Sequence, residues 1–191
     1  MKKNRKLVNQ AKNLSANELH HFLLNSNVNP SINYTFEISY ASQLSNSFQQ
    51  QIMDLFELNM KTLYEQSKDG YNRNDKYQEL FSDQSRYLLI LSSSHIIAYA
   101  HFRFDMDYGR HVLYLYELQV NMNYQGQGLG QWIMEQMKIL CRKTQMLKIV
   151  LTVQKMNQKA IDFYIEKCRF QIDSTDSNDA DVDYIILSFS V

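Results

Sequence analysis

One glycine-rich stretch constrains the fold of this chain more than any other part of its sequence. Three of the five glycines, Gly126, Gly128 and Gly130, fall at alternate positions between a strand-like run, His111–Val120, and an apolar helical pattern that begins at Leu129. A strand, a tight turn and a helix start in this order direct backbone N–H groups and the positive end of the helix dipole at one point. The glycines let the chain turn and a ligand approach without obstruction by Cβ atoms. The stretch therefore predicts either a phosphate or pyrophosphate site or a turn that binds nothing.

The bulk composition narrows the class of protein. With 191 residues, of which 45% are apolar and 13% aromatic, the chain is expected to form one globular domain with an appended segment. A formal net charge of zero gives no overall field that would attract nucleic acid or a membrane surface. The two cysteines, Cys141 and Cys168, are too far apart for a CxxC motif, which argues against a disulfide framework or a zinc site. Without a membrane-spanning apolar run or a signal-peptide core, we expect a soluble intracellular protein.

The first 30 residues are treated as a segment of their own, ahead of a domain over residues 31–191. They carry a basic cluster and loosely helical apolar spacing, which predicts one helix that ends near Leu24, before Pro30. The basic cluster is interpreted as a solvated end, with a nucleic-acid or nuclear-localisation patch as the alternative.

The remaining chain alternates between strand and helix patterns. Strands are predicted over residues 32–40, 86–92, 95–107, 111–120, 147–153, 168–172 and 182–189. Helices are predicted over residues 48–63, 74–81, 129–140 and 157–167. This order predicts a mixed α/β domain in which an antiparallel first half precedes a βαβ crossover behind the glycine turn.

The glycine spacing excludes two common nucleotide-binding motifs. A dinucleotide-binding G-x-G-x-x-G opens a βαβ unit early in a domain, and a Walker loop ends in Lys-Ser/Thr. The run Gln125–Gly130 instead matches Q/R-x-x-G-x-G/A, and the N-x-x-A-x-x-F-Y pattern of Asn157–Tyr164 follows on the next helix. Together with the strand order, these motifs resemble the GNAT superfamily of N-acetyltransferases over essentially residues 33–190.

Four further blocks are similar to one branch of that superfamily, the D-type N-terminal acetyltransferases. They are Met60–Ser67, Ala100–Asp105, Leu113–Glu117 and Leu151–Lys155. The resemblance implies a GNAT fold with a central, mostly antiparallel sheet flanked by helices, and acetyl-CoA as the cofactor. It implies direct acetylation of the N-terminal serine of Ser-Gly-Arg-Gly tails, as in histone H4 and a second core histone. We accordingly expect a cytoplasmic and nuclear monomer that binds the tail peptide and neither nucleic acid nor membrane.

The family's roles transfer to matching positions. Glu117 is implied as the general base, with Tyr116 as the second catalytic position. The implied cofactor positions are Leu118, Gln119, Val120, Gln125, Gly126, Gln127, Gly128, Leu129, Gly130, Gln131 and Asn157. The implied peptide-binding positions are Tyr64, Asp105, Tyr114, Tyr116, Thr152 and Tyr184. No metal site is expected.

Two departures from the family pattern qualify these roles. Asp69 and Tyr71 stand where the family carries tryptophans, which makes the peptide preference harder to transfer. Gln125 and Gln127 stand where a basic loop is expected, so phosphate binding is predicted to depend mainly on backbone N–H groups.

Elementary chemistry supports the same site but requires an irregular strand. An α-amine has a pKa near 7.7–8.0, against about 10.4 for lysine, so a carboxylate acting directly or through water is a sufficient base. In a regular strand Tyr114 and Tyr116 face away from Glu117, so a shared site needs a bulge or a splay. Tyr164 is interpreted as a core aromatic, with protonation of the departing thiolate as its alternative role. Cys141 and Cys168 are interpreted as buried small side chains rather than acyl carriers.

Two rival functions and one hypothesis stay open. The chain could be a GNAT enzyme acting on lysine side chains or small amines, or a non-catalytic module that binds acyl-CoA and histone tails. The peptide positions argue against the first, and Glu117 with a complete glycine loop argues against the second. The tract Asp173–Asp183 holds five aspartates and neither Lys nor Arg. It is either a solvated loop or a local field beside the peptide groove that steers a basic tail.

Overall fold

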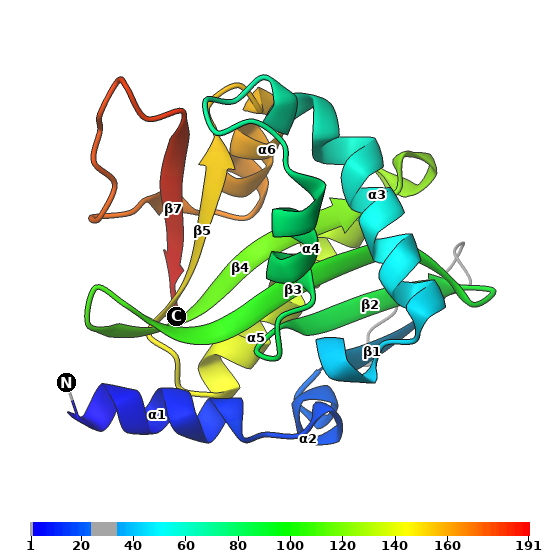
Figure 1. The fold of residues 1–191 in the computed structure, drawn as a ribbon. Coiled ribbons are helices and arrows are strands. Elements are labelled where there is room, and N and C mark those ends of the chain that lie inside the picture. Colours follow the sequence, from blue (N-terminus) through cyan, green and yellow to red (C-terminus); the bar gives the residue numbers. More distant parts are fainter. Residues whose placement is uncertain (1, 24–33) are drawn as a thin grey trace.

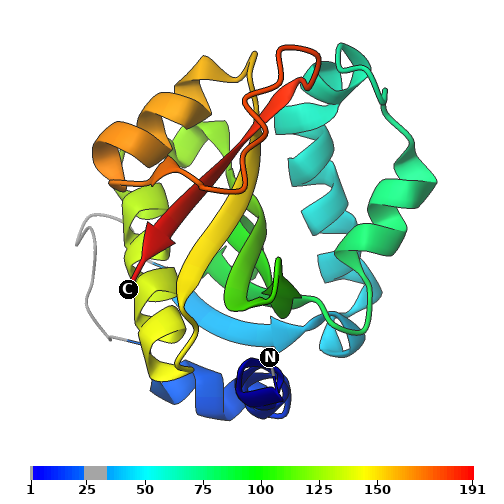
Figure 2. The same cartoon turned by 90° about the vertical axis from the view of Figure 1, so that its left-hand side faces the viewer.

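The chain folds around one seven-stranded sheet with helices on both faces (Figures 1 and 2). The computed structural model describes residues 2–23 and 34–191. The strand order is β1-β2-β3-β4-β5-β7-β6, and each neighbouring pair is antiparallel except β4 and β5. The strands are β1 (Thr35–Tyr40), β2 (Arg86–Ser92), β3 (His95–Asp107), β4 (Arg110–Val120), β5 (Lys148–Gln154), β6 (Gln171–Ile172) and β7 (Tyr184–Ser190). The predicted mixed α/β fold with one parallel crossover is confirmed.

Helices cover both faces of the sheet close to the predicted positions. One face carries α3 (Asn46–Glu65) and α4 (Arg73–Leu80), and the other carries α5 (Leu129–Lys143) and α6 (Gln158–Asp162). Helix α6 continues as a π-helical turn, η3 (Phe163–Lys167). Helix α3 starts at Asn46, two residues before the predicted stretch, because the Ser45 hydroxyl accepts the backbone N–H of Phe48, as an N-cap does.

The N-terminal part differs from the single helix that the sequence analysis predicted. It forms α1 (Lys2–Lys12) and α2 (Ala16–His21). The break comes at Ser15, whose hydroxyl accepts the Glu18 N–H while the Glu18 carboxylate accepts the Ser15 N–H, a capping box. Both helices pack on the sheet, α1 against β3 and β4 and α2 against β1. The predicted helix end at Leu24, the stop at Pro30 and the predicted strand start at Ile32 lie outside the described residues.

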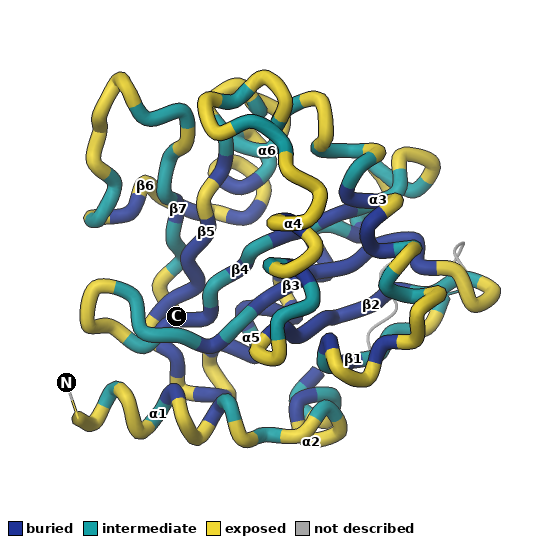
Figure 3. The backbone as a smooth tube through the Cα atoms, in the orientation of Figure 1, coloured by how far each residue is buried: buried dark blue, intermediate teal, exposed yellow. Residues whose placement is uncertain are grey.

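The sheet separates two buried cores, seen as the dark-blue centre of Figure 3. On the α5 side, Phe102 and Phe104 of β3 are fully buried with Ile133 of α5. On the α3 side, Tyr87 and Tyr99 are fully buried and pack with Ile52. Burial of each such side chain stabilises the fold by roughly 1.5–3 kcal/mol. These contacts hold the helices against the two faces of the sheet.

Two irregularities of β4 open the middle of the sheet. His101 of β3 pairs with Glu117, whereas Phe102 pairs with Leu115, so Tyr116 is an extra residue in β4. This bulge places Glu117 on the same face as Tyr114. On its other side β4 pairs with β5 only over residues 112–114, and the two strands then diverge (Figure 1). The bulge and the splay that a shared site requires are both present.

The C-terminal strands are shorter than predicted. Strand β6 begins at Gln171 rather than at Cys168, because Cys168 ends η3 and Arg169 has a positive φ of 63°. Positive φ is unfavourable for a residue other than glycine and interrupts an extended strand. Strand β7 begins at Tyr184, two residues after the predicted start.

A buried ion pair ties the segment after β6 to β5. The ammonium of Lys148 contacts the carboxylate of Asp173, and their side chains are 4% and 2% exposed. The second carboxylate oxygen accepts hydrogen bonds from the N–H and the hydroxyl of Thr175 at 2.9 and 2.7 Å. Burial opposes the charge on Asp173, but Lys148 and the hydrogen bonds outweigh it and hold the pKa of Asp173 below its usual value.

Replacing Asp173 by alanine should lower the free energy of unfolding at pH 7 by about 3–5 kcal/mol, because Lys148 would keep a buried charge without its partner. An acid whose pKa is depressed by folding stabilises the protein above its unfolded pKa, near 3.9 for Asp, and loses this effect as pH falls toward the folded pKa. The deficit of Asp173→Ala, measured by urea unfolding, should therefore shrink below about pH 4. The exposed Asp162→Ala variant serves as the control, and a deficit that stays constant down to pH 3 would contradict this account.

Candidate active site

Two adjoining pockets occupy the gap where β4 and β5 diverge. The first, here called the glycine pocket, is a cavity of about 490 Å³ between α3, β4, the glycine turn and α6. The second, here called the groove, is a cavity of about 250 Å³ between β4, β5, the segment after α3 and the start of β7. Leu118, Gln119 and Tyr164 line both, so the pockets meet at the β4 bulge.

The glycine pocket gathers nearly all the positions predicted to contact the cofactor. Its lining includes Leu118, Gln119, Val120, Gln125, Gly126, Gly128, Leu129, Gly130, Gln131 and Asn157. Gln127 is the predicted position that does not line it, and its side-chain amide donates to the Asn123 carbonyl instead.

The glycine turn is built to present backbone N–H groups. Gly126 and Gly128 have φ of 74° and 88°, a left-handed conformation that glycine adopts without strain. The N–H of Trp132 donates to the Gly128 carbonyl at 3.0 Å and so begins the hydrogen-bond ladder of α5. The amides of residues 129–131 precede that bond and have no acceptor within the helix. This arrangement at a helix N-terminus can bind a phosphate group.

Gly130 has a packing role instead. A Cβ atom at this position would lie 3.2 Å from the Phe163 ring, closer than ordinary contacts allow. The glycine thus lets η3 approach α5 closely, which brings the α6 and η3 residues to the pocket.

Two lysines that the sequence analysis missed also line the glycine pocket. Lys159 of α6 donates to the Gln125 side-chain carbonyl at 2.7 Å, and Lys167 lies in η3. Helix α6, which continues into η3, is capped by Asn157, whose side-chain oxygen accepts the Ala160 N–H. Positive charge therefore comes from the following helix rather than from the turn. Exposed lysines on a helix are common in proteins. Only their position on the helical segment after Asn157 could have indicated a role at the pocket.

The groove brings four of the six predicted peptide positions together with Glu117. They are Tyr64, Tyr116, Thr152 and Tyr184. Tyr114 is outside the lining but packs on Tyr116, with ring centroids 4.9 Å apart. Burial raises the pKa of Tyr114 to about 12, which keeps its hydroxyl protonated at neutral pH.

Asp105 does not line the groove. Its side chain is 47% exposed and lies 3.7 Å from the Lys12 ammonium at the end of α1. The alternation of β3 places it on the same face as Arg103 and Tyr114. The structure therefore sets Asp105 on the same face of the sheet as Tyr114 but beyond the groove, beside a cation of the same chain.

Glu117 is buried and held by two donors. One carboxylate oxygen accepts from the Lys76 ammonium at 3.1 Å and the other from the Gln119 amide at 2.8 Å. Burial raises the pKa of Glu117, and the positive charge of Lys76 opposes that rise. Lys76 also donates to the Tyr64 hydroxyl at 3.0 Å and to Glu79 at 2.6 Å. The sequence analysis missed Lys76, because one lysine in a short polar helix carries no signal of burial.

Tyr116 is fixed by the groups behind it. The ring of His101 stacks on Tyr116 with centroids 5.0 Å apart, and the Arg103 guanidinium lies 4.3 Å from the centre of the Tyr116 ring. Burial holds the pKa of His101 well below its usual value, so this imidazole is neutral at physiological pH. The tyrosine that projects from the bulge therefore has little freedom to move.

The two positions that depart from the family pattern take different places. Asp69 lines the groove. Tyr71 packs on Tyr64 and donates its hydroxyl to Glu57 at 2.6 Å. Burial and the Glu57 carboxylate raise the pKa of Tyr71 to about 12. Tyr71 thus supports Tyr64 from behind, and it does not replace the missing aromatic side chain in the groove.

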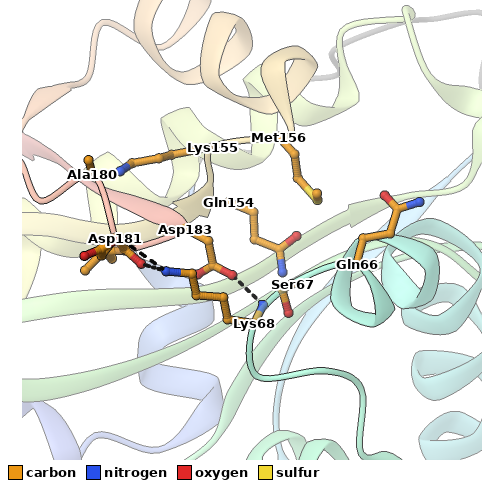
Figure 4. A pocket seen from close by; sticks show the side chains of 10 residues that line it. Gln66, Ser67, Lys68, Gln154, Lys155, Met156, Ala180, Asp181 and Asp183 are labelled. Atoms are coloured by element: carbon orange, nitrogen blue, oxygen red, sulfur yellow. Dashed lines mark hydrogen bonds and ion pairs between the residues drawn. The ribbon is translucent and has the colours of Figure 1, made fainter.

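The acidic tract crosses the mouth of the groove. A hollow of about 360 Å³ lies there between the C-terminus of α3, the end of β5 and residues 180–183 (Figure 4). The backbone N–H of Lys68 donates to the Asp183 carboxylate at 2.9 Å, and its ammonium donates to the Asp181 carbonyl. Lys155 donates to the Asp179 carbonyl at 2.8 Å. Asp183 lines both this hollow and the groove.

Two aspartates of the tract have structural roles instead. Asp173 is buried against Lys148, and Asp176 accepts the Ile186 N–H at 2.9 Å. Asp179 and Asp181 are exposed, and the Asp181 carboxylate lies 4.0 Å from the Lys68 ammonium. A basic ligand at the groove would therefore share Asp181 and Asp183 with Lys68.

Among the described residues, no group of three or more His, Cys, Asp or Glu side chains could hold a metal ion. Within residues 2–23 and 34–191, no helix combines the length and the apolar composition needed to cross a bilayer.

Comparisons with known proteins agree with this geometry. The model of the acetyltransferase (GNAT) family matches residues 52–170. PaiA N-acetyltransferase from Thermoplasma acidophilum, solved in complex with coenzyme A, is 18% identical over 82% of this chain and 99% of its own, with a TM-score of 0.59.

Two structures with peptide-like ligands are also similar. Arabidopsis thaliana Naa50, in complex with the bisubstrate analogue CoA-Ac-MVNAL, is 20% identical over 82% of this chain and 99% of its own, with a TM-score of 0.56. A chain of the NatC complex bound to Gag peptide and CoA is 14% identical over 84% of this chain and 99% of its own, with a TM-score of 0.61. At these identities the likeness is one of fold.

Both cysteines are buried, as the sequence analysis predicted. Cys141 is 0% and Cys168 2% exposed, and burial raises the pKa of each thiol to about 12. Neither can form a thiolate readily at neutral pH, and neither lines the two pockets.

Both thiols of the folded protein should therefore react with Ellman's reagent at pH 8 at least about 100-fold more slowly than after unfolding in urea. A Ser174→Cys variant supplies an exposed thiol as the control, which should react fast in the folded state. Rapid modification of either native cysteine would contradict the assignment and would reopen a covalent thiol intermediate.

Proposed function

We propose that this chain, which belongs to the acetyltransferase (GNAT) family, acetylates the α-amine of a basic Ser-Gly-Arg-Gly tail such as that of histone H4. It is an acetyl-CoA-dependent acetyltransferase, and the proposal concerns its acceptor. The observation that carries the proposal is the groove, which has a buried carboxylate at its floor, tyrosines on its walls and aspartates at its mouth. Its inner end meets the glycine pocket at Leu118 and Gln119.

The residues of the glycine pocket fit coenzyme A. The left-handed Gly126 and Gly128 and the amides at the start of α5 suit a pyrophosphate. Lys159 and Lys167 add the positive charge that the turn lacks. Acetyl-CoA supplies the acetyl group as a thioester. That PaiA was solved with coenzyme A and Naa50 with a CoA-linked peptide analogue supports this fit.

The splay between β4 and β5 provides the other contacts in this proposal. Beyond residue 114 the edge of β4 that faces β5 has no strand partner among the described residues, so its backbone groups are available to a ligand. N–H groups of residues 118–120 can then stabilise the oxyanion that develops when an amine attacks a thioester carbonyl. Tyr164 lines both pockets, and burial raises the pKa of its hydroxyl, which is therefore protonated, as a donor to the leaving thiolate must be.

An α-amine is the acceptor that a single carboxylate can serve. At pH 7.4 roughly a quarter of an α-amine is neutral, against about one in a thousand lysine side chains. In the proposal Glu117 accepts the remaining proton directly or through water. The PaiA-like fold alone does not select an acceptor, whereas the NatC complex and Naa50 were solved with a peptide and a peptide analogue, which favours a protein N-terminus.

The acidic mouth supports a basic peptide. Asp69 and Asp183 line the groove, and the exposed Asp181 lines the adjoining hollow. Asp179, also exposed, precedes these residues in the same loop. A guanidinium that entered here would gain charge-assisted hydrogen bonds. An arginine that instead reached Asp105, one of the peptide-binding positions implied by the family, would compete with Lys12.

A direct assay tests the acceptor. Acetyl-CoA is incubated with a Ser-Gly-Arg-Gly-Lys peptide whose N-terminus is free or blocked, and the products are mapped by mass spectrometry. We expect acetylation of the serine α-amine in the free peptide only, and a loss of about 10²- to 10⁴-fold in kcat/KM for Glu117→Gln. The Glu37→Gln variant, on the edge strand β1, should behave as wild type. Equal modification of the blocked peptide would indicate a lysine acetyltransferase, and no modification of either, with coenzyme A still bound, would indicate a binding module.

A charge-removal variant tests the acidic mouth. Asp179→Asn with Asp181→Asn should raise the KM for the basic peptide about threefold at low salt and leave kcat unchanged, because it weakens the field that attracts the peptide. The difference should vanish near 1 M salt, where the screening length is about 3 Å. The variant Asp54→Asn with Asp75→Asn removes the same charge from α3 and α4 and is the matched control. A KM equal to wild type at low salt would refute steering by this loop.

A further inference from the structure

We propose that Lys76 is a positioning residue for acetyl transfer, whose ammonium group pairs with Glu117 and holds Glu117 and Tyr64 in place in the groove. The inference rests on the proposed function, because it concerns the same carboxylate. Lys76 lies on α4, outside every motif that the sequence analysis identified.

The ammonium of Lys76 is fully engaged. Its three protons face three acceptors: Glu117 at 3.1 Å, the Tyr64 hydroxyl at 3.0 Å and Glu79 at 2.6 Å. It also lies 4.7 Å from the centre of the Phe56 ring. The side chain is only 6% exposed, so water does not replace these partners. A group that is held in this way fixes its neighbours and is poorly placed to carry protons.

Fold stability does not explain a lysine at this position. Lys76 and Leu80 are the buried residues of α4. Leu80 belongs to the apolar core beneath α3, and the Lys76 ammonium lies over the Phe56 ring. Burying an ammonium group costs several kcal/mol, and a well-packed apolar side chain in place of a buried ion pair is often as stable or more so. Glu79, which is 37% exposed, already provides a counter-charge near the surface. The added contact with the fully enclosed Glu117 is the feature that calls for a functional reason.

The contact sets the direction in which Glu117 points. Lys76 holds one carboxylate oxygen, and Gln119 holds the other at 2.8 Å. Gln119 is in turn held by the Asn59 amide of α3 at 2.9 Å. A carboxylate has about four lone-pair sites, so two stay available toward the groove. Residues of α3, α4 and β4 therefore orient the carboxylate together.

Lys76 is the cation that opposes the effect of burial on Glu117. Burial raises the pKa of Glu117, Lys76 lowers it, and Glu79 raises it again. His101, which pairs with Glu117 across the strands, is neutral because burial lowers its pKa. The other ionisable groups that face Glu117 are uncharged tyrosines, Tyr64 of α3, Tyr87 of β2, Tyr99 of β3 and Tyr164 of η3. Removal of Lys76 should therefore leave Glu117 protonated to a higher pH.

The test measures the protonation of Glu117 directly, and activity separately. The carboxyl carbon of Glu117 is followed by NMR against pH in ¹³C-glutamate-labelled protein, with its signal assigned by its absence in Glu117→Gln. In Lys76→Met we expect the titration midpoint to rise by about 1–3 pH units, the range for loss of a contacting opposite charge. The acid limb of kcat should move in the same direction, and kcat should fall at least about tenfold at pH 7. Lys76→Arg, which retains the charge, should keep the midpoint within about half a unit of wild type.

Lys138 provides a matched control. It is another buried lysine, with a side chain 7% exposed, paired with Glu135 at 2.7 Å and lying 4.3 Å from the centre of the Phe189 ring. Lys138→Met removes a buried ammonium group from its carboxylate partner, as Lys76→Met does, yet should leave the Glu117 midpoint and the acid limb of kcat where they are.

An unchanged Glu117 midpoint in folded Lys76→Met would overturn the proposal. If Lys76→Met does not fold, Lys76→Gln, which keeps a hydrogen-bond donor without the charge, is measured in its place, and the same unchanged midpoint would overturn the idea. The NMR titration needs no acceptor. Failure of the proposed substrate would therefore appear as a wild-type protein that does not acetylate the peptide while the midpoint shift remains.

Discussion

The structure depends on the incomplete pairing of β4 with its two neighbouring strands. Strand β4 remains paired with β3 through an extra residue at Tyr116 and loses β5 after residue 114. Backbone groups in the middle of a sheet must find partners, since an unpaired buried N–H or C=O is costly. The amides of Asn59 and Gln125 satisfy the Val120 carbonyl, and the rest of this edge faces the two pockets. The same bulge turns Glu117 toward Tyr114, so catalytic geometry and ligand access have one origin.

The sequence predicted what local patterns determine. Two neighbouring strand-like runs located β2 and β3, and three closely spaced glycines located the start of α5. The shared face of Tyr114 and Glu117 followed from the argument that a regular strand would separate them. The split of the N-terminal helix was also readable, because Ser15 and Glu18 form a capping-box pattern that the helical spacing alone overlooks.

The sequence could not show contacts that depend on how close separate helices and strands lie in the fold. Lys76, Lys159 and Lys167 are ordinary polar helix residues until the fold brings them to a carboxylate or to the glycine turn. Asp105 is the opposite case, a position that the sequence analysis identified but that the fold places outside the groove. Its position along β3 and the packing of α1 decide whether it can reach a ligand, and the structure pairs it with Lys12. Its role in binding the peptide stays a prediction.

The glycine pocket depends largely on backbone groups and the groove on side chains, so the two pockets should respond differently to sequence change. The glycine pocket relies on backbone N–H groups and on two residues with positive φ, so it tolerates Gln125 and Gln127 in place of basic residues when lysines arrive from α6 and η3. The groove is made of side chains from α3, β4, β5 and β7, each held by specific partners. Replacing a family tryptophan by Asp69 there changes both shape and charge at its lining. Divergence within such a fold should therefore alter the acceptor well before it alters the cofactor.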